Sequence, residues 1–121
     1  MKTKHILLIA LWGFLSCTYD NASPKPMEIG PCDTTEVHFS EDIFPIIQSN
    51  CFMNCHNGNS PSSGFRLETY EQIKQKVDDG RLRGAVFQEP GFVAMPLGSS
   101  PLSDCDLDRI DVWIERGALN D

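Results

Sequence analysis

Basic residues are scarce in this 121-residue sequence, which has 10 lysines and arginines against 17 aspartates and glutamates. The resulting net charge of −7 excludes binding to nucleic acid through attraction to its phosphates. It equally excludes electrostatic attachment to a surface of anionic lipid. A chain of this charge favours a basic protein partner over an acidic one.

Long hydrophobic runs are also lacking. The longest, residues 5–15, is too short for a membrane-spanning helix, which needs about 20 apolar residues. Lys2 and Lys4 precede this run, and the small residue Ser16 follows it. A positive start, a short apolar stretch and a small residue at the end are typical of a secretory signal peptide.

The end of this stretch, Phe14-Leu15-Ser16-Cys17, resembles the lipobox of bacterial lipoproteins. That resemblance implies that the cysteine is acylated and becomes the mature N-terminus. An ordinary signal peptide followed by a chance cysteine is the alternative. We expect residues 1–16 to be a lipoprotein signal peptide, with lipid on Cys17 anchoring the exported protein to a bacterial membrane, in the periplasm or at the cell surface.

Residues 17–31 have no hydrophobic periodicity and contain three prolines, which predicts a flexible tether. Residues 32–121 are then the single domain. Strand patterns are scarce within it. Residues 85–87 and 92–94 flank Glu89-Pro90-Gly91 and allow a β-hairpin as an alternative, but an isolated hairpin is marginally stable.

Three segments of the domain predict helices, and the fold class is therefore all-α. The first is capped by Ser40 and ends near Asn50. The second runs from Tyr70 to about Asp79, and Thr69 with Gln72 predicts a capping box at its start. The third is capped by Ser103 and stopped by Gly117. We expect residues 81–84 to form a short basic turn. The apolar faces of the first and third helices are expected to pack on each other.

The sequence Cys51-Phe52-Met53-Asn54-Cys55-His56 places two thiols and an imidazole close together. Each thiol can add across a vinyl group of haem, and the adjacent histidine can then bind the iron, as in c-type haem attachment. The usual gap between the cysteines is two residues, and here it is three, so the extra residue is expected to bulge outward. A local disulfide and a metal site are the alternatives for these residues.

The cysteine count adds a second constraint. The chain has five cysteines, and exported proteins seldom leave thiols without a role. If Cys17 is acylated and Cys51 and Cys55 hold haem, Cys32 and Cys105 remain to pair with each other. Without haem, the four cysteines of the domain can pair in three ways.

Met95 is the candidate for a second iron ligand. Proline at position 96 favours an extended backbone at Met95, which projects its thioether from a stiff segment. A thioether is a soft ligand suited to haem iron. A core-filling methionine is the alternative.

Together, residues 39–51, Cys55-His56, Met95-Pro96 and residues 102–118 resemble a monohaem c-type cytochrome domain of exported bacterial lipoproteins. The resemblance implies a small all-α fold, of about three main helices, with the first and last helices crossing around a covalent haem. It further implies that Cys51 and Cys55 are the thioether cysteines, with His56 and Met95 as the axial iron ligands.

The sequence therefore predicts an electron carrier and not an enzyme, serving a redox partner protein. Two alternatives stay open. One is a haem module whose distal side is open because Met95 does not bind iron, acting as a sensor or in a peroxidase-like reaction. The other is a haem-free, disulfide-stabilised lipoprotein that acts as a binding module.

Overall fold

The computed structural model describes residues 32–121, without the side chains of Met53 and Asn54. The described chain is helical and contains no strand, which confirms the predicted all-α class. None of the described helices is long and apolar enough to cross a membrane. The predicted signal peptide, the tether and Cys17 lie outside the described residues.

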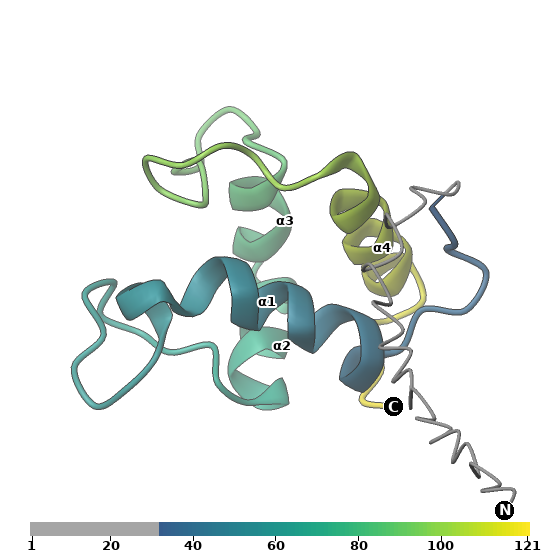
Figure 1. Cartoon of the computed structure of the whole chain (residues 1–121), viewed down its shortest axis with the longest axis horizontal. Coiled ribbons are helices and arrows are strands. Elements are labelled where there is room, and N and C mark those ends of the chain that lie inside the picture. Colours follow the sequence, from purple (N-terminus) through teal and green to yellow (C-terminus); the bar gives the residue numbers. More distant parts are fainter. Residues whose placement is uncertain (1–31) are drawn as a thin grey trace, which may run out of the picture.

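The first helical segment is continuous but changes its pitch twice. It begins with a π-helical turn η1 (Phe39–Ile43), continues as α1 (Phe44–Cys51) and ends in a second π-helical turn η2 (Phe52–His56). Figure 1 shows α1 along the middle of the molecule. This segment therefore reaches beyond Asn50, where we expected it to end.

The predicted cap at Ser40 is wrong, because the helix begins at Phe39 and the cap position, two residues earlier than expected, is occupied by His38. Two carboxylates satisfy the first N–H groups in place of a cap side chain. Asp42 Oδ2 accepts from the N–H of His38 at 3.0 Å, and Asp121 Oδ1 accepts from that of Phe39 at 2.8 Å. The start of the helix is therefore set partly by a residue at the other end of the domain.

Helix α2 (Tyr70–Asp78) begins with the capping box that the sequence predicts. The side chain of Thr69 accepts from the N–H of Gln72, and the side chain of Gln72 accepts in return from the N–H of Thr69. Gly80 then adopts a left-handed conformation with φ of 75°, which an L-residue rarely takes. This turns the chain sharply after the helix.

Helix α3 (Arg81–Val86), which adds to the three helices that the sequence predicts, follows at once. The predicted basic turn at residues 81–84 and the alternative hairpin at 85–94 are both wrong. Leu82 and Val86 lie one helical turn apart and are both buried, so the apolar spacing is that of a helix. Residues 91–99 then return over α3 as a loop, and the N–H of Met95 donates to the carbonyl of Ala85 at 3.0 Å.

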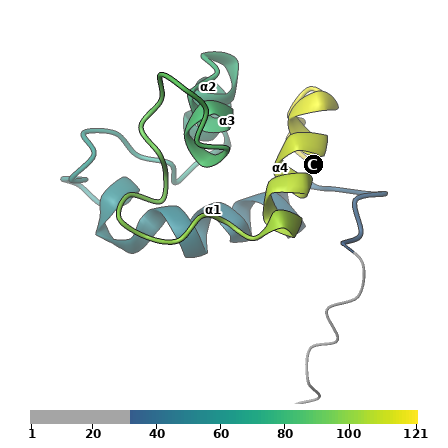
Figure 2. The same ribbon diagram turned by 90° about the horizontal axis from the view of Figure 1, so that it is seen from above.

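Helix α4 (Asp104–Glu115) starts at the predicted cap, where the side chain of Ser103 accepts from the N–H of Asp106 at 3.1 Å. Trp113 and Ile110 on its inner face are buried in the core. The indole of Trp113 stacks on the ring of Phe39, with centroids 5.7 Å apart. The last helix thus packs on η1 at the start of the first one, and Figure 2 shows α4 at a steep angle to α1.

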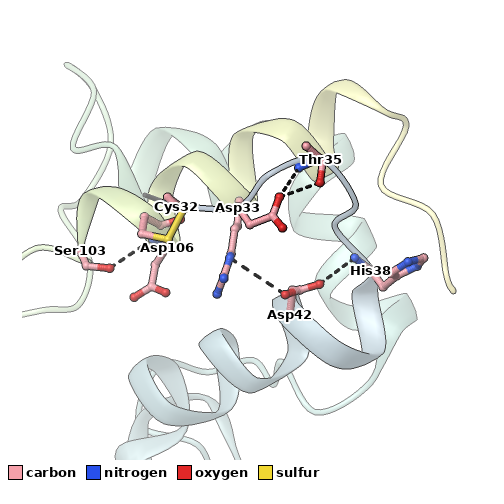
Figure 3. A network of polar contacts seen from close by, with 9 residues as sticks. Cys32, Asp33, Thr35, His38, Asp42, Ser103 and Asp106 are labelled. Carbon is pink, nitrogen blue, oxygen red and sulfur yellow. Dashed lines mark hydrogen bonds and ion pairs between the residues drawn. A yellow bond between two sulfur atoms is a disulfide. The ribbon is translucent and has the colours of Figure 1, made fainter. Parts of the chain in front are cut away.

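A disulfide joins Cys32 to Cys105 in the first turn of α4. Figure 3 shows this bond beside a group of polar contacts, one of which links η1 to α4. Within that group the guanidinium of Arg109 lies 4.0 Å from the carboxylate of Asp42. The disulfide and the core contacts therefore hold the two ends of the domain together, on the side away from the loops at 57–69 and 91–99 (Figure 1).

Candidate haem site

The main cavity of the described domain has a volume of about 610 Å³ and is lined mostly by apolar side chains. That volume lies within the range of about 300–1,000 Å³ found for small-molecule and cofactor sites. All four residues that the sequence singles out for haem line it: Cys51, Cys55, His56 and Met95. Two segments about 40 residues apart in the chain thus face one space.

The π-helical turn η2 carries Cys55 and His56, and Cys51 ends α1 directly before it. A π-helix bonds each residue to the fifth one along, so its turn holds one more residue than an α-helical turn. The three residues between Cys51 and Cys55 lie within this wider turn, which accommodates the extra residue. Both cysteines therefore reach the same cavity despite the longer gap.

The loop after His56 returns to the end of η2 and fixes it. The N–H of Leu67 donates to the carbonyl of His56 at 2.8 Å, and the hydroxyl of Ser63 donates to that of Cys55 at 2.7 Å. This return brings the ring of Phe65 against the imidazole of His56, with centroids 4.5 Å apart. Phe65 and Leu67 both line the cavity and contribute to its apolar wall.

His56 is 5% exposed and is the buried polar residue of the described core. Its Nδ1 atom is buried without a hydrogen bond of ordinary geometry. Burial lowers the pKa of the imidazole because it disfavours the charged form, and a backbone contact with Phe65 offsets part of this lowering. The imidazole is therefore neutral at neutral pH, which is the form that binds metals.

The two thiols of the motif differ in their surroundings. Burial beside the cavity, with a smaller contribution from neighbouring Cys55, raises the pKa of Cys51 to about 11. Cys55 is exposed. The local disulfide that we held as an alternative is not formed, since both residues are thiols in the structure.

Met95 is half-buried at the cavity, on the loop that returns over α3. Its backbone hydrogen bond to Ala85 ties this loop to the helix, so the position of the thioether is set by α3. The peptide bond to Pro96 is cis. The described geometry thus places Met95 and His56 on walls of one cavity that come from different elements.

Large apolar side chains are exposed at several of the described positions, and all of these except Leu119 line the cavity. Phe65, Phe92, Val93 and Leu97 are between 37% and 72% exposed. Phe92 packs on Gly84 of α3, where a β-carbon would come within 2.4 Å of the ring. Exposed apolar surface gathered around one hollow is typical of a ligand site.

Two cations line the cavity, Lys76 of α2 and Arg81 of α3. Arg83 does not line it and pairs with Asp111 and Glu89 instead. Lys76 was missed. Its spacing of three from buried Ile73 on α2 was the available signal, since such residues share a helix face.

The described residues hold no cluster of three or more histidine, cysteine, aspartate or glutamate side chains that could bind a metal ion. Comparison with models of protein families, with curated proteins and with solved structures finds no match. The site must therefore be interpreted from its own residues.

Proposed function

We propose that this protein is a c-type cytochrome that transfers electrons through a covalently bound haem. Cys51 and Cys55 would form the thioether bonds, and His56 and Met95 would bind the iron from its two sides. The resulting fold would be cytochrome c-like, with the haem in the cavity between η2, α3 and the loop at 91–99. The protein would then be an electron carrier and not an enzyme.

The observation that carries the proposal is the convergence of Cys51, Cys55, His56 and Met95 on one cavity. The cysteines and the histidine were singled out by their spacing, and Met95 by its place before Pro96. Two thiols for the vinyl groups of haem, with an imidazole and a thioether for its iron, are the groups that a c-type haem with histidine and methionine ligands uses. A disulfide-stabilised binding module gives no reason for this particular combination.

The surroundings of these residues also fit haem. The imidazole of His56 is buried at the cavity wall and neutral, which is the form that binds a metal. The exposed rings of Phe65 and Phe92 would be covered by a flat apolar molecule in the cavity. Their burial would add stabilisation of about 25 cal/mol per Å² of apolar surface removed from water.

The protein's own residues would set the conditions for electron transfer. Haem supplies reversible one-electron chemistry when it is bound. The neutral imidazole of His56 offers a nitrogen lone pair, and the thioether of Met95 binds without losing a proton, so both donors are ready at neutral pH. The apolar walls would shield the group from water, and a methionine ligand in addition to the histidine would raise the reduction potential.

The acidic chain favours a redox partner with a basic docking surface, and the partner would be reached from a membrane through lipid on Cys17. Labelling of the exported protein with a radioactive fatty acid tests the anchor. Label should enter the native chain and not Cys17→Ser.

A pyridine haemochrome spectrum of protein made with a haem-attachment system tests the haem itself. We expect a covalent c-type spectrum and the mass of one haem on the chain. Loss of covalent haem from Cys51→Ser/Cys55→Ser is the matched control. A colourless protein from cells that mature other cytochromes would overturn the proposal.

Met95→Ala distinguishes an electron carrier from a module with an open distal side. If Met95 binds the iron, the variant changes spin state and its potential falls. Val93→Ala, which shortens an apolar side chain of the same loop, should leave both unchanged. A haem protein in which Met95→Ala has no effect would favour the sensor or peroxidase-like alternative.

A further inference from the structure

The cavity differs in charge from the chain that encloses it. The chain carries a net charge of −7, yet no aspartate or glutamate lines the cavity in the described domain. Its charged lining residues are Lys76 and Arg81. A purely apolar ligand gains nothing from two cations, and placing them beside an apolar space costs solvation free energy.

One carboxylate holds both cations in place. Asp79 Oδ2 lies 3.7 Å from Nζ of Lys76 and 3.6 Å from Nε of Arg81. Asp79 Oδ1 also accepts from the backbone N–H of Arg81 at 3.0 Å, at the sharp turn between α2 and α3. Asp79 itself does not line the cavity. Lys76 and Arg81 carry two positive charges and Asp79 carries one negative charge, so the three residues together present a positive charge to the cavity.

The two cations differ in exposure. The side chain of Lys76 is 14% exposed, and its Nζ lies 4.8 Å from the centre of the Phe65 ring. The side chain of Arg81 is 68% exposed. Lys76 is therefore a largely buried cation of the cavity wall, and Arg81 is a solvent-exposed one. The guanidinium of Arg81 can donate two hydrogen bonds to one carboxylate.

We propose that Lys76 and Arg81 form a carboxylate-binding subsite of the cavity, with Asp79 as the positioning residue. The ligand class is then a flat apolar molecule that carries acidic groups at one edge. This inference rests on the proposed function and deepens it, because haem carries two carboxylates. It assigns their recognition to the corner between α2 and α3.

The neighbouring arginine provides a control within the same helix. Nε of Arg83 donates to Oδ1 of Asp111 at 2.9 Å, its Nη1 pairs with Glu89, and its guanidinium lies 4.7 Å from the centre of the Phe87 ring. Arg83 does not line the cavity. Lys74 on α2 pairs with Asp78 and also lies outside the cavity lining, so it is the matched control for Lys76.

Protoporphyrin IX and its dimethyl ester test the proposal without iron or thioether bonds. Each is titrated by fluorescence into the full chain, made in cells that lack a haem-attachment system. We expect the diacid to bind at least tenfold more tightly than the ester. Lys76→Gln/Arg81→Gln should remove this preference, whereas Lys74→Gln and Arg83→Gln should keep it.

Equal affinity of the native chain for diacid and ester overturns the proposal, and so does a failure to bind either. This comparison needs no variant, so it stands even if the double variant does not fold. If it unfolds, the single variants Lys76→Gln and Arg81→Gln should each lower the preference.

A diacid preference in a chain that never attaches haem would support the subsite while contradicting the cytochrome proposal. Covalent haem on a chain that shows no diacid preference would support the cytochrome proposal and contradict the subsite.

Discussion

The ring of Phe92 packs directly on Gly84 of α3, and a β-carbon at Gly84 would lie 2.4 Å from Cδ2 and 2.5 Å from Cε2 of that ring. The loop at 91–99 can approach the helix this closely only because position 84 has no side chain. This contact helps to form the wall of the cavity on the side of Met95.

Gly84→Ala should therefore push Phe92 away from α3. We expect the free energy of unfolding to fall by about 1–3 kcal/mol, as in other cases of overpacking, measured by urea denaturation. Adding Phe92→Ala to Gly84→Ala should make the two effects non-additive, because the clash is then removed. Additive losses would show that the ring does not lie against Gly84 in solution.

The Cys32–Cys105 disulfide closes a loop between residues 73 positions apart. Its removal by Cys32→Ser/Cys105→Ser should cost about 4 kcal/mol on the chain-entropy model of the unfolded state. Bound haem would reduce this cost, because it already restrains the unfolded chain. Urea denaturation of oxidised and double-serine protein, at equal haem content, measures the difference, and a loss below about 1 kcal/mol would contradict the estimate.

Asp121 links acid stability to the start of the first helix. Its pKa is lowered, chiefly because its carboxylate accepts from the N–H of Phe39, with a smaller contribution from His38. A carboxylate whose pKa is lower in the folded state stabilises that state above its unfolded pKa of about 3.9. This stabilisation is lost as the pH falls below that value.

We therefore expect Asp121→Asn to be less stable than the native chain at pH 7 and to approach it in stability near pH 3. Thermal or urea unfolding over this pH range measures the difference. His38→Gln keeps the hydrogen bond from Phe39, so it should retain most of the pH dependence. A constant difference between Asp121→Asn and the native chain would contradict this account.

Arg83 should matter for the contact between α3 and α4 and not for the cavity. Its pair with Asp111 is partly exposed, and such pairs contribute about 0.2–1 kcal/mol. A double-mutant cycle of Arg83→Ala with Asp111→Ala should give a coupling free energy in this range. A variant Arg83→Ala that lost covalent haem would contradict this assignment.

The helix signals that lie close together in the sequence gave correct predictions. The capping box at Thr69 and Gln72 and the cap at Ser103 each depend on residues three positions apart, and both form as predicted. The start of the first helix was misplaced, because Asp121 contributes to it from 82 residues away. No local pattern contains that information.

Helix α3 was missed for a different reason. Gly84 and the aromatic and β-branched residues after it suggest a turn and a strand, but burial of Leu82 and Val86 on one helix face outweighs these local preferences. The same limit applies to the site. Cys51, Cys55, His56 and Met95 were found by residue type together with local spacing, whereas Lys76 and Phe92 have roles that depend on tertiary contacts.

Because the turn η2 is π-helical, its backbone accommodates three residues between Cys51 and Cys55. Deleting one residue between Cys51 and Cys55 would rotate everything after it by about 100° around the helix axis, unless the turn tightened to α-helical pitch at the same time. A search pattern that demands a fixed two-residue gap overlooks chains that bring both thiols to one cavity through a wider turn.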